Sequence, residues 1–312
     1  MRVQENFARN IQSSFKEEGR AWLEQLPELI QYCEEKWKLQ IKEPYCLSFN
    51  YVAPALRKGG GEVVIKLGVP GKGISNEYEA LKHLNGIVPL IDADLDKGVL
   101  ILEKIEPGNT LSELTNESEI CQIAAKVVKK MIVSTPPQTH LPSTLDRETD
   151  MKHICKQSLD QLGPFSNATL KRSAKVFAYL NKTMKEPMLV HGDFHHYNVL
   201  SNGPDSWVAI DPKGLIGEVE YDLIQFFMNC LPENGAFGVI ENRVEQLTQE
   251  LNLNLQRLLL WGYAHSVLSS AWTVDEKTGN YDKLFSQCPD IFKELYHKRF
   301  QQTIDDFLEK AS

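Results

Sequence analysis

The segment HGDFHHYNVL, residues 191–200, concentrates side chains that can do chemistry. It contains Asp193 and, five residues later, Asn198, and a second acid, Asp211, follows a predicted turn and short strand. Phosphoryl transfer from a magnesium nucleotide requires this pattern: an acid, an amide five residues later and a second acid after a hairpin. One carboxylate takes the proton of the acceptor hydroxyl, while the amide oxygen and the other carboxylate hold Mg²⁺ on the phosphates.

The same segment allows a second interpretation, because His191, His195 and His196 could join Asp193 in a metal site such as a zinc centre. A closed zinc site would need a further ligand, and no second His or Cys group in the sequence has convincing spacing. We therefore interpret the histidines as parts of the loop or as contacts to the substrate. A metallohydrolase remains the alternative.

Two residues upstream extend the phosphoryl-transfer pattern. Lys66 ends the predicted strand GEVVIKL, from which an ammonium group can reach phosphate oxygens. Glu77 lies in the helix predicted next and can pair with that lysine, and Glu79 in the same helix is a rival partner. A strand lysine followed by a helix glutamate and the later loop favours a nucleotide-binding cleft.

The elements that must position these residues form two unequal lobes. We predict a small lobe over residues 1–105, in which helices are followed by strands. We predict a larger and mainly helical lobe over residues 106–312. The fold class is therefore α+β. The predicted elements are helices over 3–37, interrupted near Gly19 and Pro27; strands over 37–67 around the turn Gly59–Gly61; a helix over 75–86; and two strands over 87–105 around Asp96–Gly98.

Composition excludes several classes of protein. The formal net charge is −8, with 34 basic and 42 acidic residues, which argues against nucleic-acid binding and suits a cationic ligand. Six scattered cysteines form no C-x-x-C pair, so we expect reduced thiols. The sequence contains no apolar run long enough to span a membrane and no signal-peptide pattern, so we expect a cytoplasmic protein that binds neither nucleic acid nor membrane.

These motifs carry a family resemblance. HGDFHHYNVL resembles the H-G-D-x-x-x-x-N loop of the aminoglycoside phosphotransferases, which are small-molecule relatives of the protein kinases. AIDPKGLIGEVEYDLIQFF and RLLLWGYAHSVLSSAW are similar to the aminoglycoside/hydroxyurea resistance kinases, a subfamily that includes streptomycin 6-phosphotransferases. The resemblance implies a two-lobed protein-kinase-like fold with an antiparallel sheet in the small lobe. It also implies ATP-dependent transfer to a hydroxyl of a small molecule, most specifically an aminoglycoside such as streptomycin. The alternatives are a kinase of another hydroxylated metabolite and a catalytically weak nucleotide-binding homologue.

The resemblance also implies residue roles, and one departure. The segment PYCLSFNYVAP, residues 44–54, contains no glycine where the family has a glycine-rich cover over the phosphates. The implied roles are Asp193 as catalytic base; Asn198 and Asp211 as magnesium ligands; Lys66 as the phosphate-binding lysine, with Glu77 preferred to Glu79 as its partner; backbone groups from Glu103 to Ile105 as the adenine contact; and Asp222 as a brace of the catalytic loop.

For several further residues, the sequence allows either a role at the substrate or a structural or surface role. Lys213 could reach the transferred phosphate or could be a surface lysine. Four acids could face a cationic substrate or, alternatively, solvent: Glu218, Glu220, Asp275 and Glu276. Three aromatic residues at helical spacing are expected to pack in the core, with an aromatic wall for substrate as the second possibility: Trp261, Tyr263 and Trp272.

Overall fold

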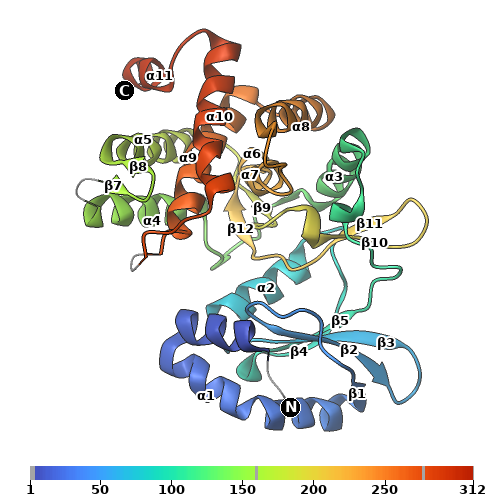
Figure 1. Ribbon diagram of the computed structural model, residues 1–312. Coiled ribbons are helices and arrows are strands. Elements are labelled where there is room, and N and C mark those ends of the chain that lie inside the picture. Colours follow the sequence, from blue (N-terminus) through green and yellow to red (C-terminus); the bar gives the residue numbers. More distant parts are fainter. Residues whose placement is uncertain (1–3, 159–160, 276–277, 312) are drawn as a thin grey trace. The chain divides into compact units, whose positions relative to one another are not determined.

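The computed structural model describes residues 4–158, 161–275 and 278–311, and it divides into two compact units. The first unit combines a sheet with helices and the second is mainly helical, which confirms the predicted α+β class (Figure 1). Unit 1 consists of Met1–His83, Ile87–Gly108 and Ser201–Lys213, and unit 2 consists of Leu84–Gly86, Asn109–Leu200 and Gly214–Ser312.

A five-stranded antiparallel sheet forms the centre of unit 1. Its strand order is β1-β2-β3-β5-β4, so that β3, the strand of Lys66, lies in the middle. Burial agrees with this central position, since β3 and β5 have the longest runs of buried residues among the strands of the sheet. The strands are β1 (Leu39–Ile41), β2 (Tyr51–Arg57), β3 (Glu62–Leu67), β4 (Leu90–Asp94) and β5 (Val99–Glu103), with a 3-10 turn η1 (Leu95–Lys97) between the last two.

The two helices of unit 1 lie on opposite sides of this sheet (Figure 1). Helix α1 (Glu5–Trp37) packs on the face that includes Ile65 and Leu67. Successive side chains of a strand point to opposite faces, so Lys66 points away from α1. On that side lies α2 (Lys72–His83), whose Glu77 meets Lys66.

Helix α1 is broken, but not where its sequence predicts. The backbone leaves helical geometry at Lys16 (φ 50°, ψ −123°), whereas the helix continues through Gly19 and Pro27. Gly19 is the point at which the two segments approach each other, because a Cβ there would lie 2.6 Å from the carbonyl oxygen of Ile11. The glycine therefore permits the close contact of the two helical segments that the break at Lys16 creates.

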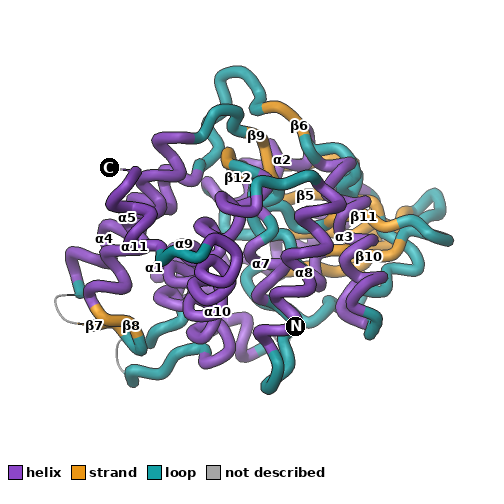
Figure 2. Tube along the Cα trace, turned by 90° about the horizontal axis from the view of Figure 1, so that it is seen from above, coloured by secondary structure: helices purple, strands orange, loops and turns teal. Residues whose placement is uncertain are grey.

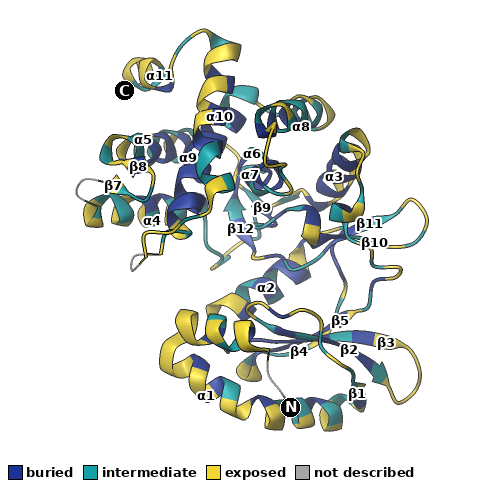
Figure 3. Ribbon diagram, in the orientation of Figure 1, coloured by how far each residue is buried: buried dark blue, intermediate teal, exposed yellow. Residues whose placement is uncertain are grey.

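Unit 2 is built around helix α9 (Leu255–Trp272), which is buried from Leu258 to Ala271 (Figure 3). A helix that is apolar on all sides needs other helices around it, and α5 and α10 pack against α9. None of the helices within the described ranges has the length and apolar character that a membrane span requires. The other helices are α3 (Glu117–Met131), α4 (Thr144–Gln157), α5 (Asn167–Thr183), α6 (Val219–Asp222), α7 (Ile224–Met228), α8 (Ala236–Leu251), α10 (Lys283–Phe300) and α11 (Ile304–Ala311), with a 3-10 turn η2 (Leu111–Glu113).

Short strands hold the ends of the HGDFHHYNVL loop. Strand β9 ends directly before His191 and is the middle strand of the three-stranded sheet β12-β9-β6 in unit 2 (Figure 2). The loop then forms a 3-10 turn and leads into the hairpin β10-β11. The elements are β6 (Val133–Ser134), β9 (Met188–Val190), η3 (His196–Asn198), β10 (Val199–Ser201), β11 (Trp207–Ala209) and β12 (Leu215–Gly217), and a separate pair joins β7 (Gln161–Leu162) to β8 (Phe165–Ser166).

A glycine in α9 sets the distance to α10. A Cβ at Gly262 would lie 2.3 Å from Cδ1 of the buried Phe292. We therefore expect Gly262→Ala to destabilise the protein by about 1–3 kcal/mol, because the core must shift to admit the methyl group. Gly238→Ala in α8 is the matched control, since nothing lies within 4 Å of its Cβ position. The control should leave stability unchanged or raise it by about 0.5–1 kcal/mol. Urea unfolding measures both, and equal stabilities would contradict the close contact.

Candidate active site

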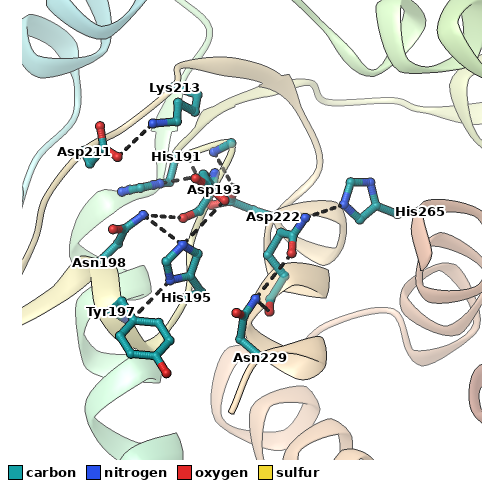
Figure 4. A network of polar contacts seen from close by, with 12 residues as sticks. His191, Asp193, His195, Tyr197, Asn198, Asp211, Lys213, Asp222, Asn229 and His265 are labelled. Atoms are coloured by element: carbon teal, nitrogen blue, oxygen red, sulfur yellow. Dashed lines mark hydrogen bonds and ion pairs between the residues drawn. The ribbon is translucent and has the colours of Figure 1, made fainter. Parts of the chain in front are cut away.

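Unit 1 contains a linked cluster of two lysines and two acids. Lys66 Nζ donates to Glu77 Oε1 at 2.6 Å and also contacts Asp211 Oδ1. Lys213 Nζ donates to Asp211 Oδ2 at 2.8 Å (Figure 4). Lys66 and Glu77 are both buried, at 4% and 3% exposure. Three residues whose roles the sequence predicts therefore meet in one polar chain, although 145 positions separate Lys66 from Asp211.

The geometry also distinguishes the two possible partners of Lys66. Glu79 lies on the exposed side of α2, where it is 3.8 Å from Lys82 and 3.4 Å from His83. Glu77, two residues earlier, points to the sheet and reaches Lys66. The pairing with Glu77 follows from the helix, because residues two apart lie on different faces.

The charges of the cluster stabilise one another. Burial by itself would lower the pKa of Lys66, but the carboxylates of Glu77 and Asp211 outweigh burial and hold that pKa above its ordinary value. Burial would raise the pKa of Asp211, and the charges of Lys66 and Lys213 instead hold it well below its usual range. Asp211 is therefore ionised at neutral pH and can act as a metal ligand.

Asp211 has an unusual backbone conformation. Its φ of 58° lies in the left-handed region, which non-glycine residues seldom adopt, although aspartate tolerates it better than most. Such conformations persist where the surroundings hold them, and they concentrate at functional sites. Asp211 follows β11 by two residues, and its carboxylate contacts Lys66.

Unit 2 contains the HGDFHHYNVL loop, which Asp222 braces. Asp222 accepts hydrogen bonds from the backbone amides of His191 (3.1 Å) and Gly192 (2.6 Å). Burial raises the pKa of Asp222 to about 7, although these two amides favour its charged form. Asn198 Nδ2 donates to the backbone oxygen of Asp193 at 3.0 Å, which closes the loop across its five residues (Figure 4). Asp193 is thus held by a loop whose backbone is fixed at both sides.

His191 and His195 accept hydrogen bonds from the backbone of the loop itself. His191 Nδ1 accepts from the backbone amide of Asp193, and His195 Nδ1 accepts from that of Tyr197. His195 Nε2 lies 3.7 Å from Asp193 Oδ1. Among the residues that the structure describes, no group of three or more His, Cys, Asp or Glu side chains is placed to hold a metal ion.

His196 is buried as an uncharged ring. It stacks on Phe226 with ring centroids 4.2 Å apart and an interplanar angle of 5°. Neither ring nitrogen has a hydrogen-bond partner within the described residues, and the side chain is 1% exposed. Burial, aided by the charge of Arg243, lowers the pKa of His196 to about 3.

This burial predicts a dependence of stability on pH. Because the folded pKa of His196 lies below the unfolded value of 6.5, its neutral form is favoured by folding, and stability is lost as pH falls from about 6.5 toward 3. We expect His196→Phe to remove about 2 kcal/mol of the stability lost between pH 8 and pH 5. His83→Gln, at an exposed site of α2, is the control and should retain the wild-type profile. Chemical unfolding at both pH values gives the slopes, and an unchanged slope in His196→Phe would refute the assignment.

The proposed adenine segment, Glu103 to Ile105, begins at the last residue of β5. The backbone amide of Glu103 donates to the carbonyl oxygen of Pro89 at 3.0 Å, and Ile105 is buried at 7% exposure. A Cβ at Gly108 would lie 2.8 Å from the carbonyl oxygen of Ile105, so the chain turns back tightly there. The contact of this segment with adenine remains a proposal.

Two polar residues of the N-terminal segment, which the sequence does not single out, hold the glycine-free stretch. Gln4 Nε2 donates to the carbonyl oxygen of Tyr45, and Gln4 Oε1 accepts from the amide of Leu47. Asn10 Nδ2 donates to the carbonyl oxygen of Ser48. These three hydrogen bonds tie the loop between β1 and β2 to α1 and its N-cap residue, and they add to the backbone hydrogen bonds from Lys42 to Pro54 and from Tyr45 to Val52.

The acids that could face a cationic substrate are mostly engaged within the protein. Glu218 forms an ion pair with Arg257 at 2.8 Å and accepts from Trp261 Nε1 at 2.7 Å. Glu220 accepts from the backbone amide of Asn254. Asp275 accepts from the backbone amide of Thr278, while Glu276 lies outside the described residues. These contacts favour structural roles for Glu218 and Glu220.

Two of the three aromatic candidates belong to the core. Trp261 and Tyr263 are buried at 0% and 1% exposure, which confirms the prediction for them. The prediction is wrong for Trp272, which is 48% exposed at the end of α9, with the Arg147 guanidinium 5.3 Å from its ring centroid. Helical periodicity could not separate the three, because α9 is buried on all sides up to its last turn.

The donor set at the predicted magnesium ligands fits Mg²⁺. Asp211 offers a carboxylate, and Asn198 offers its amide oxygen because its nitrogen already donates to Asp193. Mg²⁺ prefers oxygen ligands and is commonly held by one or two protein side chains together with substrate phosphates. Each of the two residues therefore offers an oxygen donor of the kind that Mg²⁺ takes up when it arrives with a nucleotide.

Comparisons of the sequence with known proteins agree on one family. A model of the aminoglycoside/hydroxyurea antibiotic resistance kinase family matches residues 43–277. The chain is 26% identical over 288 residues to streptomycin 6-kinase of Streptomyces glaucescens, covering 90% of this chain and 93% of that protein. It is 27% identical over 266 residues to hydroxyurea phosphotransferase of Kitasatospora aureofaciens, covering 83% of this chain and 76% of that protein.

A solved structure shares the fold. It is a thermostable mutant of aminoglycoside phosphotransferase APH(4)-Ia in a ternary complex with ADP and hygromycin B. The two proteins superpose with a TM-score of 0.57 at 15% identity, covering 84% of this chain and 97% of the other. At this identity the match establishes the kinase-like fold and no more.

Proposed function

Because the chain belongs to the aminoglycoside/hydroxyurea antibiotic resistance kinase family, we propose that it transfers the γ-phosphoryl group of ATP to a hydroxyl of an aminoglycoside such as streptomycin. The family consists of small-molecule kinases, so phosphoryl transfer to an alcohol group is the general activity. The observation that supports the proposal most strongly is the buried Lys66–Glu77 pair linked to Asp211. Burying a lysine with its acidic partners carries a large desolvation cost, so the pair contributes little to stability. Such buried charged groups concentrate at functional sites, which supports a catalytic role.

In the proposed mechanism, Asp193 positions the acceptor hydroxyl and accepts its proton as the oxygen attacks the γ-phosphorus. The bond from that phosphorus to the β,γ-bridging oxygen breaks, and ADP leaves. Lys66, held in place by Glu77, neutralises negative charge on the phosphate oxygens. Mg²⁺, when bound through Asn198 and Asp211, supplies further charge neutralisation.

A second acceptor has equal support from sequence identity. The hydroxyurea phosphotransferase is as similar to this chain as the streptomycin kinase, at 27% against 26%. Hydroxyurea also carries a hydroxyl group, so the same catalytic groups would serve. The formal net charge of −8 favours the cationic aminoglycoside.

The test is a screen of acceptors for ATP-dependent mass gain of one phosphoryl group. The panel comprises streptomycin, hygromycin B and hydroxyurea, each with wild-type protein and with Asp193→Ala. We expect streptomycin to be phosphorylated by the wild type alone. Phosphorylation of hydroxyurea only would favour the second acceptor. Nucleotide binding without transfer to any member of a broader panel of hydroxylated metabolites would favour a catalytically weak homologue.

A further inference from the structure

Asp211 is held by two lysines that differ in their freedom to move. Lys66 contacts Oδ1 from the buried side, where its side chain is 5% exposed and also bound to Glu77. Lys213 contacts Oδ2 from the open side, where its side chain is 44% exposed (Figure 4). Each carboxylate oxygen of Asp211 therefore already contacts an ammonium group. Lys213 can leave without depriving a buried charge of its partner, whereas the departure of Lys66 would leave the buried Glu77 unpaired.

The charges of the cluster sum to zero. Glu77 and Asp211 contribute two negative charges, and Lys66 and Lys213 contribute two positive charges. A divalent metal ion would compete with the two lysine ammonium groups for the lone pairs of the Asp211 carboxylate. Lys213 is the group to be displaced, because an exposed ion pair contributes little stability whereas a buried lysine without its partner is costly.

We propose that Lys213 is an exchangeable counter-ion of Asp211. Asp211 would hold the metal of a bound metal nucleotide, and the Lys213 ammonium group, once released from Oδ2, would neutralise charge on the oxygens of the transferred phosphoryl group. Lys213 lies two residues beyond Asp211, with Pro212 between them, so its backbone stays beside the site while its flexible side chain swings. Lys213 is then a catalytic residue as well as a competitor of the metal. The inference rests on the proposed function.

The proposal predicts opposite effects of one substitution. Lys213→Gln should tighten binding of Mn²⁺ to the nucleotide-free protein by about 2- to 5-fold, because the competing ion pair is gone. It should also slow single-turnover phosphoryl transfer by about 10-fold or more, because a cation on the phosphoryl oxygens is lost. Mn²⁺ replaces Mg²⁺ in the binding measurement because electron paramagnetic resonance counts the free ion directly.

Two control variants make the result specific. Lys82→Gln removes the same charge from the same unit at 45% exposure, where the lysine faces Glu79, and should change neither quantity. Asp211→Asn should abolish the Mn²⁺ site and so identifies it. An Mn²⁺ affinity unchanged in Lys213→Gln would overturn the competition, and an unchanged transfer rate would overturn the move to the phosphoryl group.

The same experiment separates this inference from the proposed function. If the wild type neither binds Mn²⁺ through Asp211 nor transfers phosphate, the proposed function fails. If the wild type does both and Lys213→Gln behaves like Lys82→Gln, the role of Lys213 alone is refuted.

Discussion

Replacing Asp193 with alanine should lower the rate of phosphoryl transfer from ATP by about 10²- to 10⁴-fold, the usual contribution of a positioned general base. Nucleotide binding should be retained, because the residues proposed to hold the phosphates, Lys66 and Asp211, belong to the other compact unit. The loop should also keep its shape, since its backbone hydrogen bonds to Asp222 do not involve the Asp193 side chain. Single-turnover assays measure the rate of phosphoryl transfer, and isothermal titration calorimetry with ATP measures nucleotide binding.

Asp205→Ala is the control for this substitution. Asp205 is an exposed acid of the hairpin turn twelve positions further along the chain, and its replacement should leave the transfer rate unchanged. Asp193→Asn keeps the volume of the side chain and should lose activity as Asp193→Ala does. If either Asp193 variant kept more than about a tenth of the wild-type rate, the general-base role would be untenable.

Local periodicity accounts for the meeting of Lys66 and Glu77 in unit 1. Strand alternation places Lys66 on the face opposite Ile65 and Leu67, and helix geometry then separates Glu77 from Glu79. Both are short-range properties of the chain, so one sequence is enough to derive them. The spacing of Asp193 and Asn198 has the same character, since the hydrogen bond between them closes within one loop.

Contacts between distant segments could not be predicted in this way. Gln4 reaches the loop at Leu47, and its type and position within a polar stretch give no signal of that contact. Arg243 is buried at 1% exposure, where it pairs with Glu117 and donates to the carbonyl oxygens that follow α7. A basic residue on an amphipathic helix is normally solvated, so only the packed structure reveals its role.

The position of the hairpin is a further long-range property. Residues 201–213 belong to unit 1 although unit 2 precedes and follows them in the chain. Val88 donates from its backbone amide to the carbonyl oxygen of Ala209 at 2.8 Å, which joins β11 to the segment before β4. This placement brings Asp211 to Lys66, so the site depends on a pairing that no local pattern encodes.

Replacing Lys66 with methionine should destabilise the protein by about 3–5 kcal/mol, because Glu77 is left as a buried charge without its partner. The variant should also lose at least about 10²-fold in phosphoryl transfer, since a cation on the phosphates is removed. Lys104→Met is the control. Lys104 pairs with Glu62 and Glu106 at a more exposed site, and its removal should cost no more than about 1 kcal/mol.

The double variant Lys66→Met with Glu77→Leu separates stability from function. Removing both charges leaves an apolar contact between β3 and α2, so most of the lost stability should return. Activity should not return, because the phosphates still lack their lysine. Urea unfolding and single-turnover rates on the four proteins of this cycle give both quantities. If activity recovered together with stability, the buried pair would be a structural element alone and the phosphate-binding role of Lys66 would be wrong. If neither recovered, burial of Glu77 would not explain the cost of the single substitution.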